Sequence, residues 1–208
     1  AGVALLAVSK TFGAQAVAEA VAAGQRDVGE NYIQEGVDKI AALRAVAPGV
    51  ALAWHCIGPI QSNKTRLVAE HFDWVHTVDR LKIAERLSAQ RPADRPPLNV
   101  CIQVNIDGGA NKSGVAPGEA LALARAVAAL PQLKLRGLMS IPEIAPDFEA
   151  ARAVHASARA LFDQLNADGL GLDTLSMGMS DDLEAAIAAG STMVRIGTAI
   201  FGSRAPKP

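Results

Sequence analysis

Short apolar runs alternate with longer helical patterns along the chain, and this alternation restricts the possible fold more than any other feature. Eight runs are typical of buried β-strands and lie at residues 3–8, 27–29, 52–57, 74–78, 98–106, 133–139, 173–176 and 193–196. Helical patterns separate them, at residues 14–23, 32–46, 65–71, 81–90, 117–130, 147–166 and 181–189. Because the connectors are short, we expect parallel pairing through right-handed crossovers. Eight strands predict an α/β fold, a single (β/α)8 barrel of the TIM type, with an open doubly wound sheet as the alternative.

Composition and charge argue against several classes of function. We expect one domain over residues 1–208, which carries 20 Lys and Arg against 21 Asp and Glu. A net charge of −1 without a basic block argues against nucleic acid as a partner. No apolar stretch approaches the roughly 18 residues of a membrane-spanning helix. Cys56 and Cys101 lack metal-ligand spacing, and the first residues lack the basic region of a signal peptide. We therefore expect a cytoplasmic protein with no metal site and no membrane partner.

The ends of the predicted strands carry the candidate functional residues, because functional groups of such barrels gather at the carboxyl ends of the strands. Lys10 follows the first strand directly. Partial burial there lowers the pKa of a lysine and favours the neutral amine that forms a Schiff base with a carbonyl compound. A solvated lysine at the start of a loop is the alternative interpretation.

Two segments near the C-terminus are typical of a phosphate site. Gly197 and Thr198 follow the eighth strand, and Ser180 precedes a helix start, where backbone N–H groups can approach an anion. Arg195, inside the apolar eighth strand, requires an acceptor, either a structural carboxylate or the ring nitrogen of a cofactor. The sequence has no dinucleotide-binding glycine motif and no P-loop. A lysine, a phosphate site and a charged ring partner together suggest pyridoxal 5′-phosphate (PLP).

Several ordered segments carry a resemblance to a known family. They are Ala-Val-Ser-Lys at 7–10, Gly-Glu-Asn-Tyr at 29–32, and the segments 54–64, 136–142, 175–182 and 194–202. Across essentially its whole length the chain resembles the pyridoxal phosphate homeostasis protein family, which is similar to the N-terminal barrel domain of alanine racemase. One departure lies at the start, since family members usually carry a helix before the first strand and this sequence begins almost on that strand.

The resemblance implies roles for nine residues of a cofactor site. Lys10 would hold PLP as a Schiff base, and Arg195 would face the pyridine nitrogen. The remaining predicted cofactor-binding residues are Ser180, Gly197 and Thr198 at the phosphate, Asn31 and His55 beside the ring, and Ser176 and Met177 at the end of the seventh strand. No catalytic residue is assigned, because family members bind the cofactor without an established turnover.

The predicted function is intracellular PLP homeostasis without strong catalytic turnover, with PLP-dependent apoenzymes as possible recipients of the cofactor. An arginine partner keeps the ring nitrogen unprotonated, which weakens the electron sink that most carbanion chemistry on PLP uses. A PLP-dependent amino-acid racemase is the alternative, although Tyr32, the only tyrosine, is expected to pack in a helix. A cofactor-free Schiff-base aldolase is a second rival. Secondary roles for Lys64 and Lys112 stay open.

Overall fold

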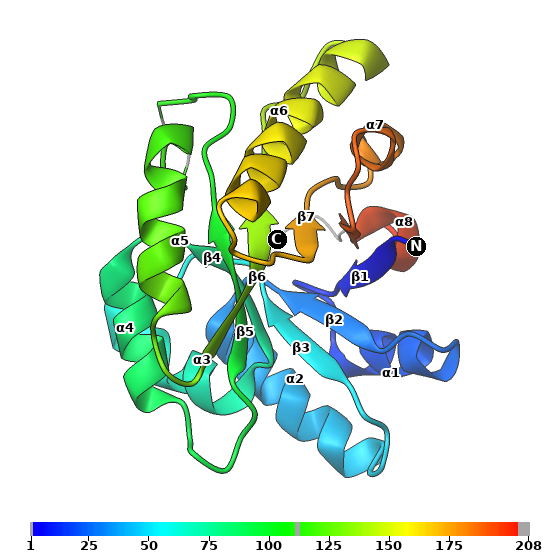
Figure 1. The fold of residues 1–208 in the computed structure, drawn as a ribbon. Helices are drawn as coiled ribbons and strands as arrows, with labels where there is room; N and C mark the ends of the chain where they lie inside the picture. The colour runs from blue at the N-terminus through cyan, green and yellow to red at the C-terminus, as the bar shows by residue number, and fades with distance from the viewer. Residues whose placement is uncertain (1, 111–112, 204–208) are drawn as a thin grey trace.

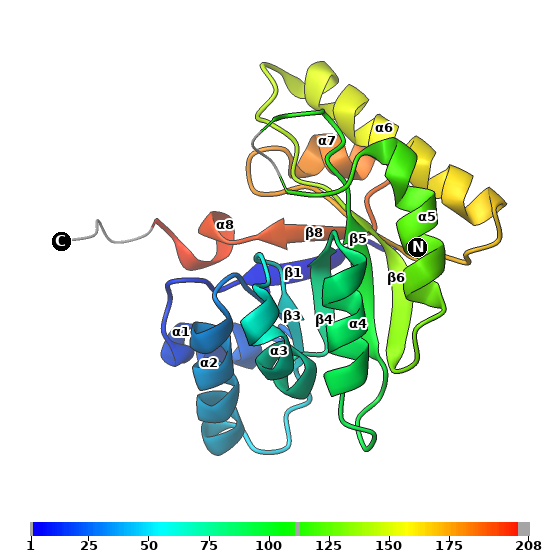
Figure 2. The ribbon, with the colours of Figure 1, turned by 90° about the vertical axis from the view of Figure 1, so that its left-hand side faces the viewer.

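Eight parallel strands close into a barrel in chain order, in a computed structural model that describes residues 2–110 and 113–203. The strands are β1 (Ala4–Val8), β2 (Asp27–Glu30), β3 (Ala53–Cys56), β4 (Trp74–Val78), β5 (Leu98–Gln103), β6 (Leu133–Met139), β7 (Thr174–Ser176) and β8 (Met193–Ile196). The pairing of Ala4 with Met193 joins β1 to β8 and closes the sheet. Figure 1 shows β1 to β7, and β8 lies beside β1 in Figure 2. The predicted (β/α)8 barrel is therefore confirmed, and the open sheet is excluded.

Helices alternate with the strands and pack around the barrel (Figure 2). They are α1 (Ala14–Ala22), α2 (Ile33–Val46), α3 (Thr65–His71), α4 (Leu81–Gln90), α5 (Ala120–Ala128), α6 (Phe148–Ala167), α7 (Leu183–Ala188) and α8 (Thr198–Phe201). The sequence pattern did not predict α8, which is a single turn and too short to show a helical period. Among the described residues, no helix is both long enough and apolar enough to cross a membrane.

Most element ends lie within one residue of those the sequence predicts, and three of the differences have a clear local reason. β5 ends at Gln103 instead of residue 106, because Val104 pairs with Val115 of the following loop in an isolated bridge. Pro117 opens a 3-10 turn (Pro117–Glu119), so α5 begins three residues later than expected. Asp147 lies outside α6 as its N-cap, and its Oδ1 accepts the Ala150 N–H at 2.8 Å.

Both faces of the strands are buried, as a parallel barrel requires. Apolar side chains fill the layer between the barrel and the helices, where Val28, Val75 and Val100 are fully buried. The interior of the barrel is partly polar, since His55 and His76 are fully buried there and their rings are hydrogen-bonded to each other at 2.9 Å. This polar interior lies below the carboxyl ends of the strands.

Candidate cofactor site

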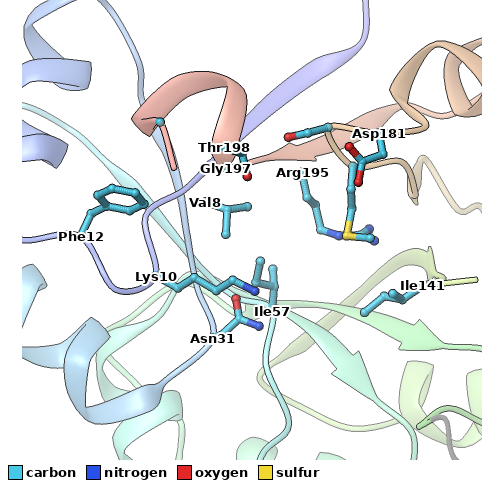
Figure 3. Close-up of a pocket in the computed structure, with 13 residues that line it drawn as sticks. Val8, Lys10, Phe12, Asn31, Ile57, Ile141, Asp181, Arg195, Gly197 and Thr198 are labelled. Atoms are coloured by element: carbon cyan, nitrogen blue, oxygen red, sulfur yellow. The ribbon is translucent and has the colours of Figure 1, made fainter. Parts of the chain in front are cut away.

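A cavity of about 400 Å³ opens at the carboxyl ends of the strands. Lys10 and Asn31 enter it from the ends of β1 and β2, and Arg195 enters from β8 on the opposite side (Figure 3). The lining consists of Val8, Lys10, Phe12, Asn31, Ile57, Ile141, Met179, Ser180, Asp181, Arg195, Gly197, Thr198 and Gly202. Six of the nine residues predicted for the site therefore meet around one cavity, although they come from four separate parts of the chain.

The turn that carries Lys10 is fixed by contacts on both sides. Thr11 has a φ of 69°, in the left-handed region that residues other than glycine rarely adopt. Its N–H donates to Glu35 Oε1 of α2 at 2.7 Å. The Phe12 N–H donates to the Ser9 carbonyl at 3.0 Å, which closes the turn. These contacts direct the half-buried Lys10 side chain toward the cavity.

A buried ion cluster supports this turn. The Lys39 ammonium donates to Glu30 Oε1 at 2.8 Å, to Glu35 Oε1 at 2.7 Å and to the Ser9 carbonyl at 2.7 Å. The Ser9 hydroxyl also donates to Glu30. Burial raises the pKa of the Glu30 carboxyl, while the hydrogen bonds from Lys39 and Ser9 oppose that rise. The cluster ties α2 to β1 and β2, and it thereby fixes the backbone next to Lys10.

Asn31 offers a polar atom without a partner to the cavity. Its Oδ1 is buried and has no hydrogen-bond partner among the described residues. Such an atom in a pocket wall indicates a ligand or water that completes its bonding. The loop after β3 fixes the backbone here, because a β-carbon on Gly58 would lie 2.0 Å from the Asn31 carbonyl oxygen. Only glycine permits this close approach.

Arg195 is almost fully buried in β8 and is held by two acceptors, one in β7 and one just after β6. Its Nη1 donates to Ser176 Oγ at 2.8 Å, and its Nη2 donates to the Ser140 carbonyl at 2.9 Å. Burial lowers the pKa of the guanidinium to about 10, so the group stays charged at neutral pH. No carboxylate of the described part of the chain forms a salt bridge with it. The charge of Asp182 attracts the guanidinium at longer range, but among the described residues no carboxylate accepts a hydrogen bond from it, so a ring nitrogen remains the candidate acceptor.

The loops after β7 and β8 form the remaining wall of the cavity. Thr198 and Gly197 lie at the start of α8, and Ser180 lies in the turn before α7. Asp181 lines the same cavity and is exposed.

Asp182, by contrast, is engaged elsewhere and does not line the cavity. Its Oδ1 accepts the Met179 N–H at 2.7 Å, and its Oδ2 pairs with Nε2 of His155 on α6 at 2.8 Å. Partial burial would raise the pKa of Asp182, but these two hydrogen bonds hold it below its ordinary value. These contacts fix the turn that carries Ser180, while the Asp182 charge still attracts that of the cavity-lining Arg195.

The structure does not bring His55, Ser176 and Met177 to the cavity. Successive side chains on a strand point to opposite faces, so His55 lies one layer below Ile57, inside the barrel. Ser176 also points inward and contacts Arg195 from below. Met177, its neighbour, packs in the apolar layer beneath the helices. The structure thus places His55 inside the barrel below the cavity lining, and its role beside a bound ring stays a prediction.

Three further residues of interest lie away from the cavity or outside the described residues. Lys64 ends the 3-10 turn Ser62–Lys64 and does not line the cavity. Lys112 lies outside the described residues. Tyr32 precedes α2 and is 58% exposed, so the expectation that it packs in a helix is wrong.

Sequence reasoning missed the apolar wall and the ion cluster. Val8, Ile57 and Ile141 each stand at or just after a strand end, and this shared position was the signal that could have found them. Nothing local in the sequence marks Lys39 as the partner of Glu30, because the pair connects a helix to a strand end.

A closed eight-stranded barrel with a lysine after its first strand and an arginine in its last defines the alanine-racemase type of barrel. The profile of the alanine racemase N-terminal domain matches residues 1–205. An alanine racemase from Clostridium difficile shares the fold with a TM-score of 0.75 at 18% identity, and the match covers 99% of this chain and 53% of that chain.

More similar relatives specify the family. The pyridoxal phosphate homeostasis protein of Pseudomonas aeruginosa is 64% identical over 204 residues, 98% of this chain and 86% of its own length. The protein of the same name from Escherichia coli K12 is 60% identical, covering 96% of this chain and 85% of its own. PipY of Synechococcus elongatus, solved with PLP bound, is 40% identical with a TM-score of 0.88, covering 96% and 92%. The chain belongs to the family of pyridoxal phosphate homeostasis proteins.

Proposed function

We propose that this protein binds PLP in the cavity at the barrel mouth and serves intracellular PLP homeostasis without strong catalytic turnover. The observation that carries the proposal is that Lys10 and Arg195 enter one cavity from opposite sides, with Ser180 and Thr198 on its wall. The PLP-bound structure of PipY supports the assignment of the ligand.

The residues present fit this cofactor. A cavity of about 400 Å³ lies within the range of roughly 300–1,000 Å³ that is typical of cofactor sites. The unpartnered Asn31 Oδ1 offers a polar contact for the polar edge of a bound ring. Arg195 has N–H donors and no acceptor, which suits an unprotonated pyridine nitrogen. Gly197 lines the cavity just before α8, so its backbone can approach an anion there.

Each of these residues has a distinct role in the proposal. PLP would supply an aldehyde, and Lys10 would hold it through its amine. Arg195 binds the ring nitrogen and discourages its protonation. The hydroxyls of Ser180 and Thr198 would donate hydrogen bonds to phosphate oxygens, and Gly197 would let the backbone approach those oxygens.

The same geometry argues against a racemase. Racemisation requires an acid or base on each face of the substrate carbon, and Lys10 can serve only one face. The single tyrosine, Tyr32, is not among the cavity-lining residues. The similarity to the Clostridium difficile racemase is restricted to 53% of that protein and shows the fold alone.

We propose further that residues 1–208 act as one cofactor-binding unit in the cytoplasm and supply PLP to apoenzymes. The cavity opens at the barrel mouth, and Thr198 on its wall is exposed, so a recipient could reach the bound cofactor directly. A purified PLP-dependent apoenzyme can be mixed with the loaded protein or separated from it by a dialysis membrane. If the transfer is direct, the apoenzyme regains activity faster in the mixture. Equal rates in the two arrangements would show release into solution.

Borohydride reduction followed by peptide mass spectrometry tests the proposed site. We expect a visible absorption band in the PLP-loaded protein, loss of that band on reduction, and a PLP-derived adduct on Lys10. Lys10→Ala should lose the band, whereas Lys64→Ala should keep it, because Lys64 does not line the cavity. An adduct that maps to Lys64 or Lys112 in the native protein would refute the assignment. A protein with no affinity for PLP that still reacts with simple carbonyl compounds would instead support the aldolase.

A further inference from the structure

A continuous line of hydrogen bonds crosses the polar interior of the barrel below the cavity. From Arg195 Nη1 it passes to Ser176 Oγ at 2.8 Å, and from Ser176 Oγ to His76 Nδ1 at 2.8 Å. His76 Nε2 lies 2.9 Å from His55 Nδ1, and His55 Nε2 lies 3.0 Å from Asp27 Oδ1. The line joins β8, β7, β4, β3 and β2, and it ends at the first residue of β2, at the end of the barrel opposite the cavity.

The two ends determine the direction of every bond in this line. A guanidinium can only donate, and a carboxylate can only accept. His55 must therefore donate from Nε2 to Asp27, which leaves its Nδ1 as an acceptor when the ring is neutral. His76 then donates from Nε2 to His55 and accepts at Nδ1 from the Ser176 hydroxyl. Ser176 in turn accepts from Arg195, so all four bonds point from the cavity toward Asp27.

Neutral rings are required for this arrangement, and their surroundings favour them. A protonated histidine has two donors and cannot accept, so it would break the line. Burial lowers the pKa of His55, although the charges of Asp27 and Asp73 oppose this and that of Arg136 adds to it. Burial also lowers the pKa of His76 well below its usual value, and His55 and Arg195 lower it further.

We propose that Ser176, His76 and His55 are positioning residues that orient Arg195 and stabilise its charge beneath the cofactor pocket. Each of them turns its acceptor atom toward Arg195 and its donor toward Asp27, so their dipoles align with the negative ends facing the guanidinium. Arg195 thus gains the support of a distant carboxylate without an ion pair that would compete with a ring nitrogen. This inference rests on the proposed function only for the identity of the group that Arg195 meets.

The bond direction can be measured without any cofactor. In the unloaded protein at pH 7, ring ¹⁵N chemical shifts should show a proton on Nε2 and none on Nδ1 in both His55 and His76. Both rings should stay neutral to a lower pH than an ordinary histidine does, because burial lowers the pKa of each. A proton on Nδ1 of either buried ring, or a charged ring at pH 7, would overturn the inference. This result stands whether or not PLP binds.

Asp27→Asn tests the positioning role from the far end of the line. An amide can donate as well as accept, so the direction is no longer fixed and part of the His55 population should carry its proton on Nδ1. In the loaded protein we expect PLP to dissociate about fivefold faster and the pH profile of its absorbance to shift. Asp173→Asn is the matched control, because Asp173 lies just before β7 at the same end of the barrel but pairs with Arg136 outside the line.

The two variants separate the possible outcomes. Altered ring shifts and faster PLP release in Asp27→Asn alone support the proposal. The positioning role is overturned if Asp27→Asn and Asp173→Asn show the same ring shifts and PLP release rates. It is also overturned if Asp27→Asn alters the ring shifts but keeps the native PLP release rate and pH profile. Failure of the native protein to bind PLP would count against the proposed function, while the ring shifts would still decide whether the line is directed as inferred.

Discussion

Replacement of Lys39 by methionine should unfold the protein at a much lower urea concentration near neutral pH. The Lys39 side chain is 6% exposed and its partner Glu30 is 0% exposed, so the variant leaves a buried carboxylate without its positive partner. Loss of one member of a buried ion pair costs about 3–5 kcal/mol of unfolding free energy. For a chain of this length that corresponds to a decrease in Tm of roughly 6–20 °C.

The pH dependence of this effect follows from Glu30. Its pKa in the folded protein is raised above the ordinary value of 4.5, chiefly by burial. A group of this kind favours folding at low pH, and that contribution is lost as pH rises through the folded-state pKa. Lys39→Met removes the hydrogen bond and the positive charge of Lys39, which oppose the rise, and leaves only the hydrogen bond from Ser9, so the folded-state pKa of Glu30 increases further. The stability deficit of the variant should therefore be large at pH 8 and smaller at pH 5.

Urea titrations at pH 5 and pH 8 measure both effects, and two further variants serve as controls. Adding Glu30→Gln to Lys39→Met removes the orphaned charge and should recover much of the lost stability at pH 8. Arg152→Met breaks an exposed pair with Glu149 and should change stability by less than about 0.5 kcal/mol. A Lys39→Met midpoint that equals the native one at pH 8, or a deficit that grows on acidification, would refute the reasoning.

Three other predictions concern the cavity. Ser180→Ala combined with Thr198→Ala should weaken PLP binding at least about tenfold, because each hydroxyl would lose a bond worth roughly 1.5–3 kcal/mol to a charged acceptor. Unchanged affinity in equilibrium dialysis would contradict this. Gly58→Ala should cost about 1–3 kcal/mol of stability, because its β-carbon would overlap the Asn31 carbonyl oxygen, whereas Gly118→Ala meets no atom within 4 Å. Equal urea midpoints for the two alanine variants would refute the steric argument. The loaded protein should interconvert L- and D-alanine no faster than free PLP does, as measured by chiral chromatography. Efficient interconversion would support the racemase function instead.

The sequence determined the order of the strands and helices and the strand ends at which the functional residues lie. Strand runs separated by helical patterns suffice to predict a parallel barrel, and its geometry places Lys10, Arg195 and the loop with Ser180 at one mouth. Most element boundaries were predicted to within one residue, because they depend on neighbours in the chain, although Asp147 was assigned to α6 and is its N-cap.

Only the tertiary structure decided which face each strand residue occupies and which distant residues meet. In a parallel barrel both faces of a strand are buried, so hydropathy alone cannot tell the inward Ser176 from the outward Met177. The contact between His76 and Ser176 joins residues 100 positions apart and depends on closure of the whole barrel. The pairing of Lys39 with Glu30 depends in the same way on how α2 packs against its strand. These long-range contacts arise from packing in three dimensions, for which a single sequence carries no periodic signal.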